Sequence, residues 1–159
     1  MSEAARTPIV VVATSDAVRR GVAAMVDDLR DALVDGEALL ADLVDAYDEV
    51  IPHVFTSELG DHVLEMRDAA SVERDLTAIS WAFERALHAC AAADEPAWRD
   101  YLVNLLAVSW FECIEVRPTV LGAFLAVSEP LVLEQYAAYV RDTELYWRIH
   151  GVASGPGPN

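Results

Sequence analysis

Hydrophobic residues recur three or four positions apart along most of this chain, which is the spacing of amphipathic helices rather than strands. Capping residues, glycines and prolines interrupt the pattern at intervals of ten to twenty-five residues. The predicted helices cover about residues 16–35, 39–51, 56–66, 71–93, 96–116, 119–127 and 130–150. We therefore expect an all-α fold, a compact bundle of six to seven helices.

The most apolar of these segments reads YLVNLLAVSWFECIEV from Tyr101 to Val116, with hydrophobic residues around nearly its whole circumference. A helix of this kind is typical of a buried position, so we expect the segment of about 96–116 to be the central, enclosed helix. Its polar side chains would then be buried and hydrogen-bonded, and they are Asn104, Ser109 and Glu112. We interpret Glu112 as structural, paired inside the bundle with an arginine or with helix-end amides.

The pattern divides the chain into three parts. Residues 1–14 contain TPIVVV, which has no second strand to pair with, and we expect an extended or flexible arm. Residues 15–150 form a single helical domain, and the glycine- and proline-rich residues 151–159 form a disordered tail. No apolar run reaches the roughly 20 residues that span a bilayer. Without a secretion signal or a C-x-x-C motif, the sequence favours a soluble cytoplasmic protein with reduced cysteines.

Charge changes this picture more than any motif does. The chain has 27 acidic and 11 basic residues, a formal net charge of −16, and every basic residue is an arginine. So acidic a surface repels nucleic acid and anionic membrane, and we expect neither as a partner. The absence of lysine excludes Schiff-base and P-loop chemistry. A GC-rich coding bias or a saline habitat is an alternative explanation of the same composition.

The acidic residues concentrate in the first two predicted helices. Nine of them lie between residues 27 and 49, against the single Arg30. Spacings of four residues place like charges one turn apart, which destabilises a helix modestly, and a basic partner would relieve that cost. We therefore assign partner binding to this hairpin, at Asp31, Asp35, Asp42 and Asp45.

Trp81 is the most informative exception to the helical pattern. It falls nearly opposite the hydrophobic stripe of its helix, on a face shared with Arg74, Arg85 and His88. Tryptophan and arginine are enriched at binding hot spots, so Trp81 and Arg85 join the candidate partner-binding residues. The alternative is that another helix or a chain terminus covers this face.

Recognisable catalytic and metal-binding motifs are missing. The chain has neither Glu-x-x-His nor His-Glu-x-x-His, and no G-x-S-x-G motif or neighbouring histidine would activate Ser109. We assign no catalytic residue, metal or cofactor. The nearest approach to a ligand set is His53, Glu58 and His62, two histidines and a carboxylate, which surface or capping roles around Pro52 also explain.

The stretch from about Leu40 to Val116 resembles an uncharacterised family of small acidic helical bacterial proteins, a domain of unknown function. The resemblance depends on PHVF at Pro52 to Phe55 and on NLLAVSWFECI at Asn104 to Ile114. It implies a helical fold and an accessory, immunity-type role. The chain departs from the family's pattern where Trp110 and Phe111 precede Glu112, in place of an aliphatic or Phe-Leu pair.

These observations favour a non-enzymatic helical binding protein that masks a basic protein partner, as an immunity protein neutralises a toxin. One alternative is a small-molecule or metal-dependent enzyme or sensor with a pocket near Glu112, His53 and His62. A further alternative is an oligomeric accessory protein, a homodimer whose interface is the Trp81 face.

Overall fold

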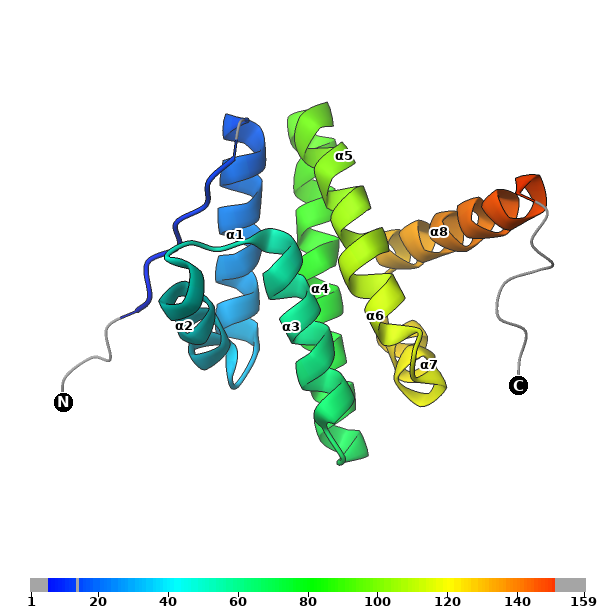
Figure 1. The fold of residues 1–159 in the computed structure, drawn as a ribbon, viewed down its shortest axis with the longest axis horizontal. Coiled ribbons are helices and arrows are strands. Elements are labelled where there is room, and N and C mark those ends of the chain that lie inside the picture. Colours follow the sequence, from blue (N-terminus) through cyan, green and yellow to red (C-terminus); the bar gives the residue numbers. More distant parts are fainter. Residues whose placement is uncertain (1–5, 14, 151–159) are drawn as a thin grey trace.

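Helices make up the regular structure that the computed structural model shows in the described residues, 6–13 and 15–150 (Figure 1). In chain order they are α1 (Asp16–Ala32), α2 (Gly36–Tyr47), α3 (Pro52–Glu65), α4 (Ala69–Ala93), α5 (Pro96–Leu105), the π-helical η1 (Leu106–Phe111), α6 (Glu112–Ile114), α7 (Pro118–Val127) and α8 (Pro130–Ile149). Because α5, η1 and α6 continue one another without a break, the described chain has seven helical units. The predicted all-α bundle is confirmed. Within these residues, no helix combines the length and hydrophobicity needed to cross a membrane.

Local sequence explains where the helices begin. Four of them start with proline, whose fixed φ and missing N–H suit the first turn. The Ser15 hydroxyl caps α1 by accepting from the Val18 N–H. Two helices begin earlier than the sequence predicts: α4 begins at Ala69, capped by Asp68, and α3 begins at Pro52, so that Thr56 lies buried inside the helix.

The middle of the bundle contains two long helical units, α4 and the continuous α5–η1–α6, and each packs against most of the others. Trp110 in η1 is fully buried and its ring lies 5.5 Å from that of Phe83 in α4 and 5.6 Å from that of Phe124 in α7. The predicted central position of residues 96–116 is therefore correct. The predicted enclosure is wrong, because Val103 and Val108 are exposed on one side.

The π-helical turns of η1 explain why Glu112 is exposed and not buried as expected. In a regular helix at about 100° per residue, Glu112 would lie on the same side as Trp98, Leu102 and Leu105, which are buried. A π-helical segment behaves as if one residue were inserted, which rotates everything after it by about 100°. That rotation turns Glu112 to the outside and Ile114 to the inside.

Asn104 is also exposed, which corrects the second expectation for a buried polar residue. It lies before η1, on the side of α5 opposite Trp98 and Leu102, so even a regular helix would expose it. The segment is therefore amphipathic at its start and not apolar all round. Ser109 is buried, as expected.

Residues 6–13 run in an extended conformation beside the first helices, on the left side in Figure 1. Val11 is buried, and the Val50 N–H donates to the Val10 carbonyl at 2.7 Å. Alternation along an extended chain turns Val10 and Val12 to the opposite side, where both are exposed. The tail from residue 151, expected to be disordered, lies outside the described residues.

The start of α8 is held by two side chains of α4. The carboxylate oxygens of Glu84 accept from the N–H groups of Leu131 and Val132 at 3.2 and 3.0 Å, and the Ser80 hydroxyl accepts from Glu129 N–H at 3.2 Å. Glu84 is only 8% exposed. Glu84 Oε1 also lies 3.4 Å from His88 Nε2 of the same helix. Its main role is to satisfy the otherwise unpaired amides of a helix start.

We expect Glu84→Ala to lower the free energy of unfolding by about 2 kcal/mol, because two amides lose a charged acceptor. Glu73→Ala, an exposed glutamate of the same helix, should change it by less than about 0.5 kcal/mol. Urea unfolding of the two variants measures the difference. Equal stability of both would show that this cap contributes nothing.

Candidate functional site

The predicted acidic residues lie on α1, on α2 and in the turn between them. Asp31 is on α1, Asp35 precedes the first residue of α2, and Asp42 and Asp45 are on α2. All four are exposed. The structure therefore brings them together at one end of the molecule, as the sequence predicts for a helical hairpin.

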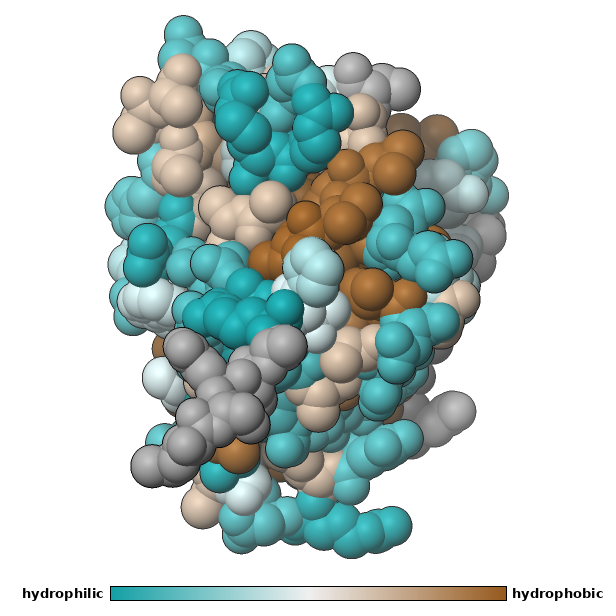
Figure 2. All heavy atoms as spheres, turned by 90° about the vertical axis from the view of Figure 1, so that its left-hand side faces the viewer, coloured by the Kyte–Doolittle hydropathy of each residue, from teal (hydrophilic) through white to brown (hydrophobic). Residues whose placement is uncertain are grey.

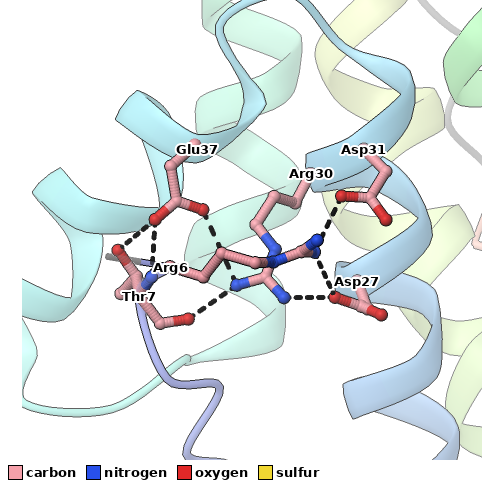
Figure 3. Close-up of polar contacts among 6 residues, drawn as sticks. All are labelled: Arg6, Thr7, Asp27, Arg30, Asp31 and Glu37. Atoms are coloured by element: carbon pink, nitrogen blue, oxygen red, sulfur yellow. Dashed lines mark hydrogen bonds and ion pairs between the residues drawn. The ribbon is translucent and has the colours of Figure 1, made fainter. Parts of the chain in front are cut away.

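Part of this acidity is already neutralised within the chain, as Figure 3 shows. The Arg6 guanidinium donates to Asp27 at 3.0 Å and to Asp31 at 2.7 Å. Arg30 also pairs with Asp27, and it donates to the Thr7 carbonyl at 2.6 Å. Residues 6 and 7 thus supply both a cation and a hydrogen-bond acceptor to α1.

Glu37 of α2 completes this network from the other side. One of its oxygens accepts from both the N–H and the hydroxyl of Thr7 at 2.6 Å, and the other lies 3.6 Å from Arg30. The hydrogen bonds from Thr7 lower the pKa of Glu37 below its ordinary value. The network therefore joins the N-terminal segment to both helices of the hairpin.

The other acidic residues of α2 are not neutralised by ion pairs in this way. Among the described residues, no arginine or histidine forms an ion pair with Asp42 or Asp45. Asp48, at the end of α2, is equally exposed and lies in the left-handed region at φ 61°. Among the described residues, these three carboxylates form no contact that stabilises the fold.

A band of hydrophobic residues crosses the same end of the molecule, between hydrophilic areas (Figure 2). The exposed hydrophobic residues of the extended segment that runs along this side are Val10 and Val12. We call these two residues the apolar band. Exposed apolar area rimmed by charge is typical of a protein–protein contact.

Trp81 is 42% exposed on α4, as the sequence predicts. The Arg85 guanidinium carbon lies 4.8 Å from the centre of its ring, and Arg85 also lies 3.5 Å from Asp28 of α1. Because α1 packs against both α2 and α4, it separates Trp81 from Asp42 and Asp45. The predicted partner-binding residues therefore occupy two neighbouring surfaces, one on each side of α1.

His62 and Asp75 form a polar contact that sequence reasoning missed. The Asp75 side chain is 3% exposed, and its oxygens lie 2.9 Å from Arg74 Nε and 3.3 Å from His62 Nε2. The same nitrogen of His62 lies 3.8 Å from Asp35. Asp35 thus faces a histidine of α3, which reduces its availability to a partner.

Ser109 does have a histidine neighbour, His53, which lies 56 positions away in the sequence. Its hydroxyl lies 2.6 Å from His53 Nδ1, and the His53 ring is 5.7 Å from that of Tyr101. A serine nucleophile also needs a group that orients the histidine and donors for the oxyanion. Among the described residues nothing hydrogen-bonds to His53 Nε2, so we interpret the pair as a contact that joins α3 to η1.

Glu112, His53 and His62 do not converge on one pocket. Glu112 lines an open groove of about 400 Å³ between η1 and α8, with aromatic walls that include Phe111, Tyr139 and Trp147. Neither histidine lines that groove. Within the described chain, no three histidine, cysteine or acidic residues are grouped so as to hold a metal ion.

The cysteines offer no reactive alternative in this structure. Cys90 is buried and Cys113 half-buried, and both are free thiols. Burial raises the pKa of Cys90 to about 11, which leaves it protonated at neutral pH. Burial, more than the nearby Asp61, also raises the pKa of Cys113. Nucleophilic chemistry at either thiol is thereby disfavoured.

The structure defines an all-α bundle with an acidic end, and comparison with known proteins adds nothing to this class. No family model, curated protein or solved structure matches the chain. The resemblance over residues 40–116 therefore stays an expectation.

We expect Glu37→Ala to free the N-terminal segment from the hairpin, because Thr7 loses the acceptor of two hydrogen bonds. Trypsin should then cleave after Arg6 several times faster than in the unaltered protein, because proteolysis follows local opening. Mass spectrometry of a digestion time course measures the rate. Asp45→Ala, which removes an exposed acid from the same helix, is the control and should cleave at the unaltered rate.

Proposed function

We propose that this protein is a non-enzymatic, cytoplasmic binding protein that masks a basic protein partner, in the manner of an immunity protein. The observation that carries the proposal is the pairing, at one end of the molecule, of the apolar band with the carboxylates of Asp42, Asp45 and Asp48. These acids have no ion-pair partner among the described residues. An apolar centre with a charged rim is the usual composition of a specific protein interface.

Arg6 supports arginine as the group that the acidic surface recognises. It reaches Asp27 and Asp31 from a segment at least twenty-one residues away in sequence, at hydrogen-bonding distance from both. The carboxylates of α1 are therefore spaced to accept a guanidinium in the folded chain. Arginine suits this role because its planar donors engage two carboxylates at once.

The net charge of −16 acts on the rate of encounter more than on the final affinity. A surface of one sign steers an oppositely charged protein toward it, and salt screens the effect. The apolar band and Trp81 would instead determine how long the complex lasts, because buried hydrophobic contacts mainly slow dissociation. The acidic residues would thus set the association rate constant, and the apolar band and Trp81 would set the dissociation rate constant.

We expect Asp42→Lys/Asp45→Lys to slow association with the basic partner at least about tenfold at low salt, with a smaller deficit at physiological salt. The partner is the basic protein recovered with the unaltered chain from host lysate, and surface plasmon resonance measures the rates. The control is Glu58→Lys/Glu65→Lys, which makes the same charge change at exposed positions of α3.

Two results would contradict the proposal in different ways. If both double variants slow association equally, net charge matters and the end formed by α1 and α2 is not the site. If neither changes binding, the masking proposal fails, and the acidity is better credited to coding bias or habitat.

Trp81→Ala tests the second surface. The side chain is partly exposed and its main partner is Arg85, so the free energy of unfolding should fall by less than about 1 kcal/mol. Binding should weaken by about 2 kcal/mol through faster dissociation if the partner reaches across α1. The control for a buried tryptophan is Trp110→Ala, which should lose about 3 to 5 kcal/mol of stability. Unfolding of the Trp81 variant would assign this residue to the core.

A further inference from the structure

Among the described residues, no other helix covers the second half of α8. Of the residues of α8, which runs from Pro130 to Ile149, only Val132 is buried. Tyr136 and Tyr139 pack against Phe111, at ring distances of 5.2 and 5.4 Å, and their hydroxyls donate to Glu115. Beyond them the helix extends away from the other helices, toward the right in Figure 1.

This half of α8 exposes hydrophobic side chains to solvent. Leu145 is 54% exposed and Ile149 is 69% exposed, and they lie one turn apart on the same face. A helix in water is stabilised mainly by burying an apolar face, so an uncovered face of this kind indicates a missing contact. Neither residue lines the groove between η1 and α8, although Asp142, at the edge of the same face, does.

The charges of this last part of α8 are balanced, unlike those of the molecule as a whole. Residues 141–150 contain two arginines, Arg141 and Arg148, and two acids, Asp142 and Glu144, against a net charge of −16 for the chain. A second copy of the chain is therefore not repelled from this segment. The acidic α1–α2 hairpin lies at the opposite end of the molecule (Figure 1).

When two copies of this helix run antiparallel, an acidic residue of one copy lies opposite a basic residue of the other. Asp142 and Arg148 lie three positions before and after Leu145. In an antiparallel pair centred on Leu145, that leucine meets its own copy, and Asp142 of each chain meets Arg148 of the other. Ile149 then lies over the aliphatic part of the Arg141 of the other chain, which is how long side chains cover apolar surface.

We infer that this protein forms a two-fold symmetric homodimer through antiparallel packing of the α8 helices, centred on Leu145. The interface contains a leucine pair and two symmetric ion pairs between Asp142 and Arg148. It leaves the two bundles at opposite ends of the helix pair, with both acidic hairpins directed away from the contact. It differs from the Trp81 face, which the sequence offered as a dimer interface.

The test uses the full chain and sedimentation equilibrium over a wide range of concentration. The unaltered protein should approach the mass of two chains as its concentration rises. Leu145→Glu should weaken dimerisation at least about tenfold, because it places two carboxylates at the two-fold axis. Val116→Glu is the matched control at an exposed valine outside α8 and should leave the dimer unchanged.

A charge exchange tests the register of the helices. Arg148→Asp and Asp142→Arg should each weaken the dimer at least about tenfold, and the double variant Asp142→Arg/Arg148→Asp should recover most of the loss, because the ion pairs re-form with reversed sign. Far-UV circular dichroism confirms that each variant is folded.

Three results would overturn the inference. These are a monomer at every concentration, a dimer indifferent to Leu145→Glu, and a charge exchange without recovery. Because the assay contains this chain alone, its outcome is independent of the proposed basic partner.

Discussion

The inward projection of Trp110 and Phe111 from η1 is the interaction on which the rest of the bundle depends. Trp110 packs edge-on against Phe83 of α4 and Phe124 of α7, and Phe111 packs against the tyrosines of α8. Three helices are thus positioned by two consecutive residues. Large aromatic side chains contribute strongly to burial, and their edge-to-face contacts fix how the helices approach one another.

The π-helical geometry of this segment is what allows that arrangement. Ser109, Trp110 and Phe111 are all buried in succession, which spreads the buried face of the helix wider than a regular turn would. The same geometry exposes Glu112 and opens the groove beside α8. A sequence read with a constant period of 3.6 residues cannot anticipate it, which is why the helix and its central position were predicted correctly while the orientation of Glu112 was not.

Other parts of the structure depend on contacts between residues distant in sequence, and these set the limit of prediction. The helical periods, the proline starts and the exposure of Trp81 are local properties, and the structure agrees with them. The contact of His53 with Ser109 and the capping of α8 by Glu84 join segments about fifty residues apart. The apolar band gave one usable signal, the β-branched run from Ile9 to Val12, because such a run is unusual where no second strand exists.

The acidic residues of α1 and α2 differ in how many of them are paired with a basic residue in the folded chain. Like charges one turn apart destabilise a helix, and the chain offsets that cost on α1 with Arg6, Arg30 and Arg85. On α2 it offsets only Glu37, which ties the N-terminal segment in place. Coding bias alone would not distinguish the two helices, since both would gain acids without regard to their partners. Carboxylates that have no ion-pair partner among the described residues, next to exposed valines, fit the proposed surface for a basic, partly apolar protein, because each group would gain most from a partner that the described chain does not supply.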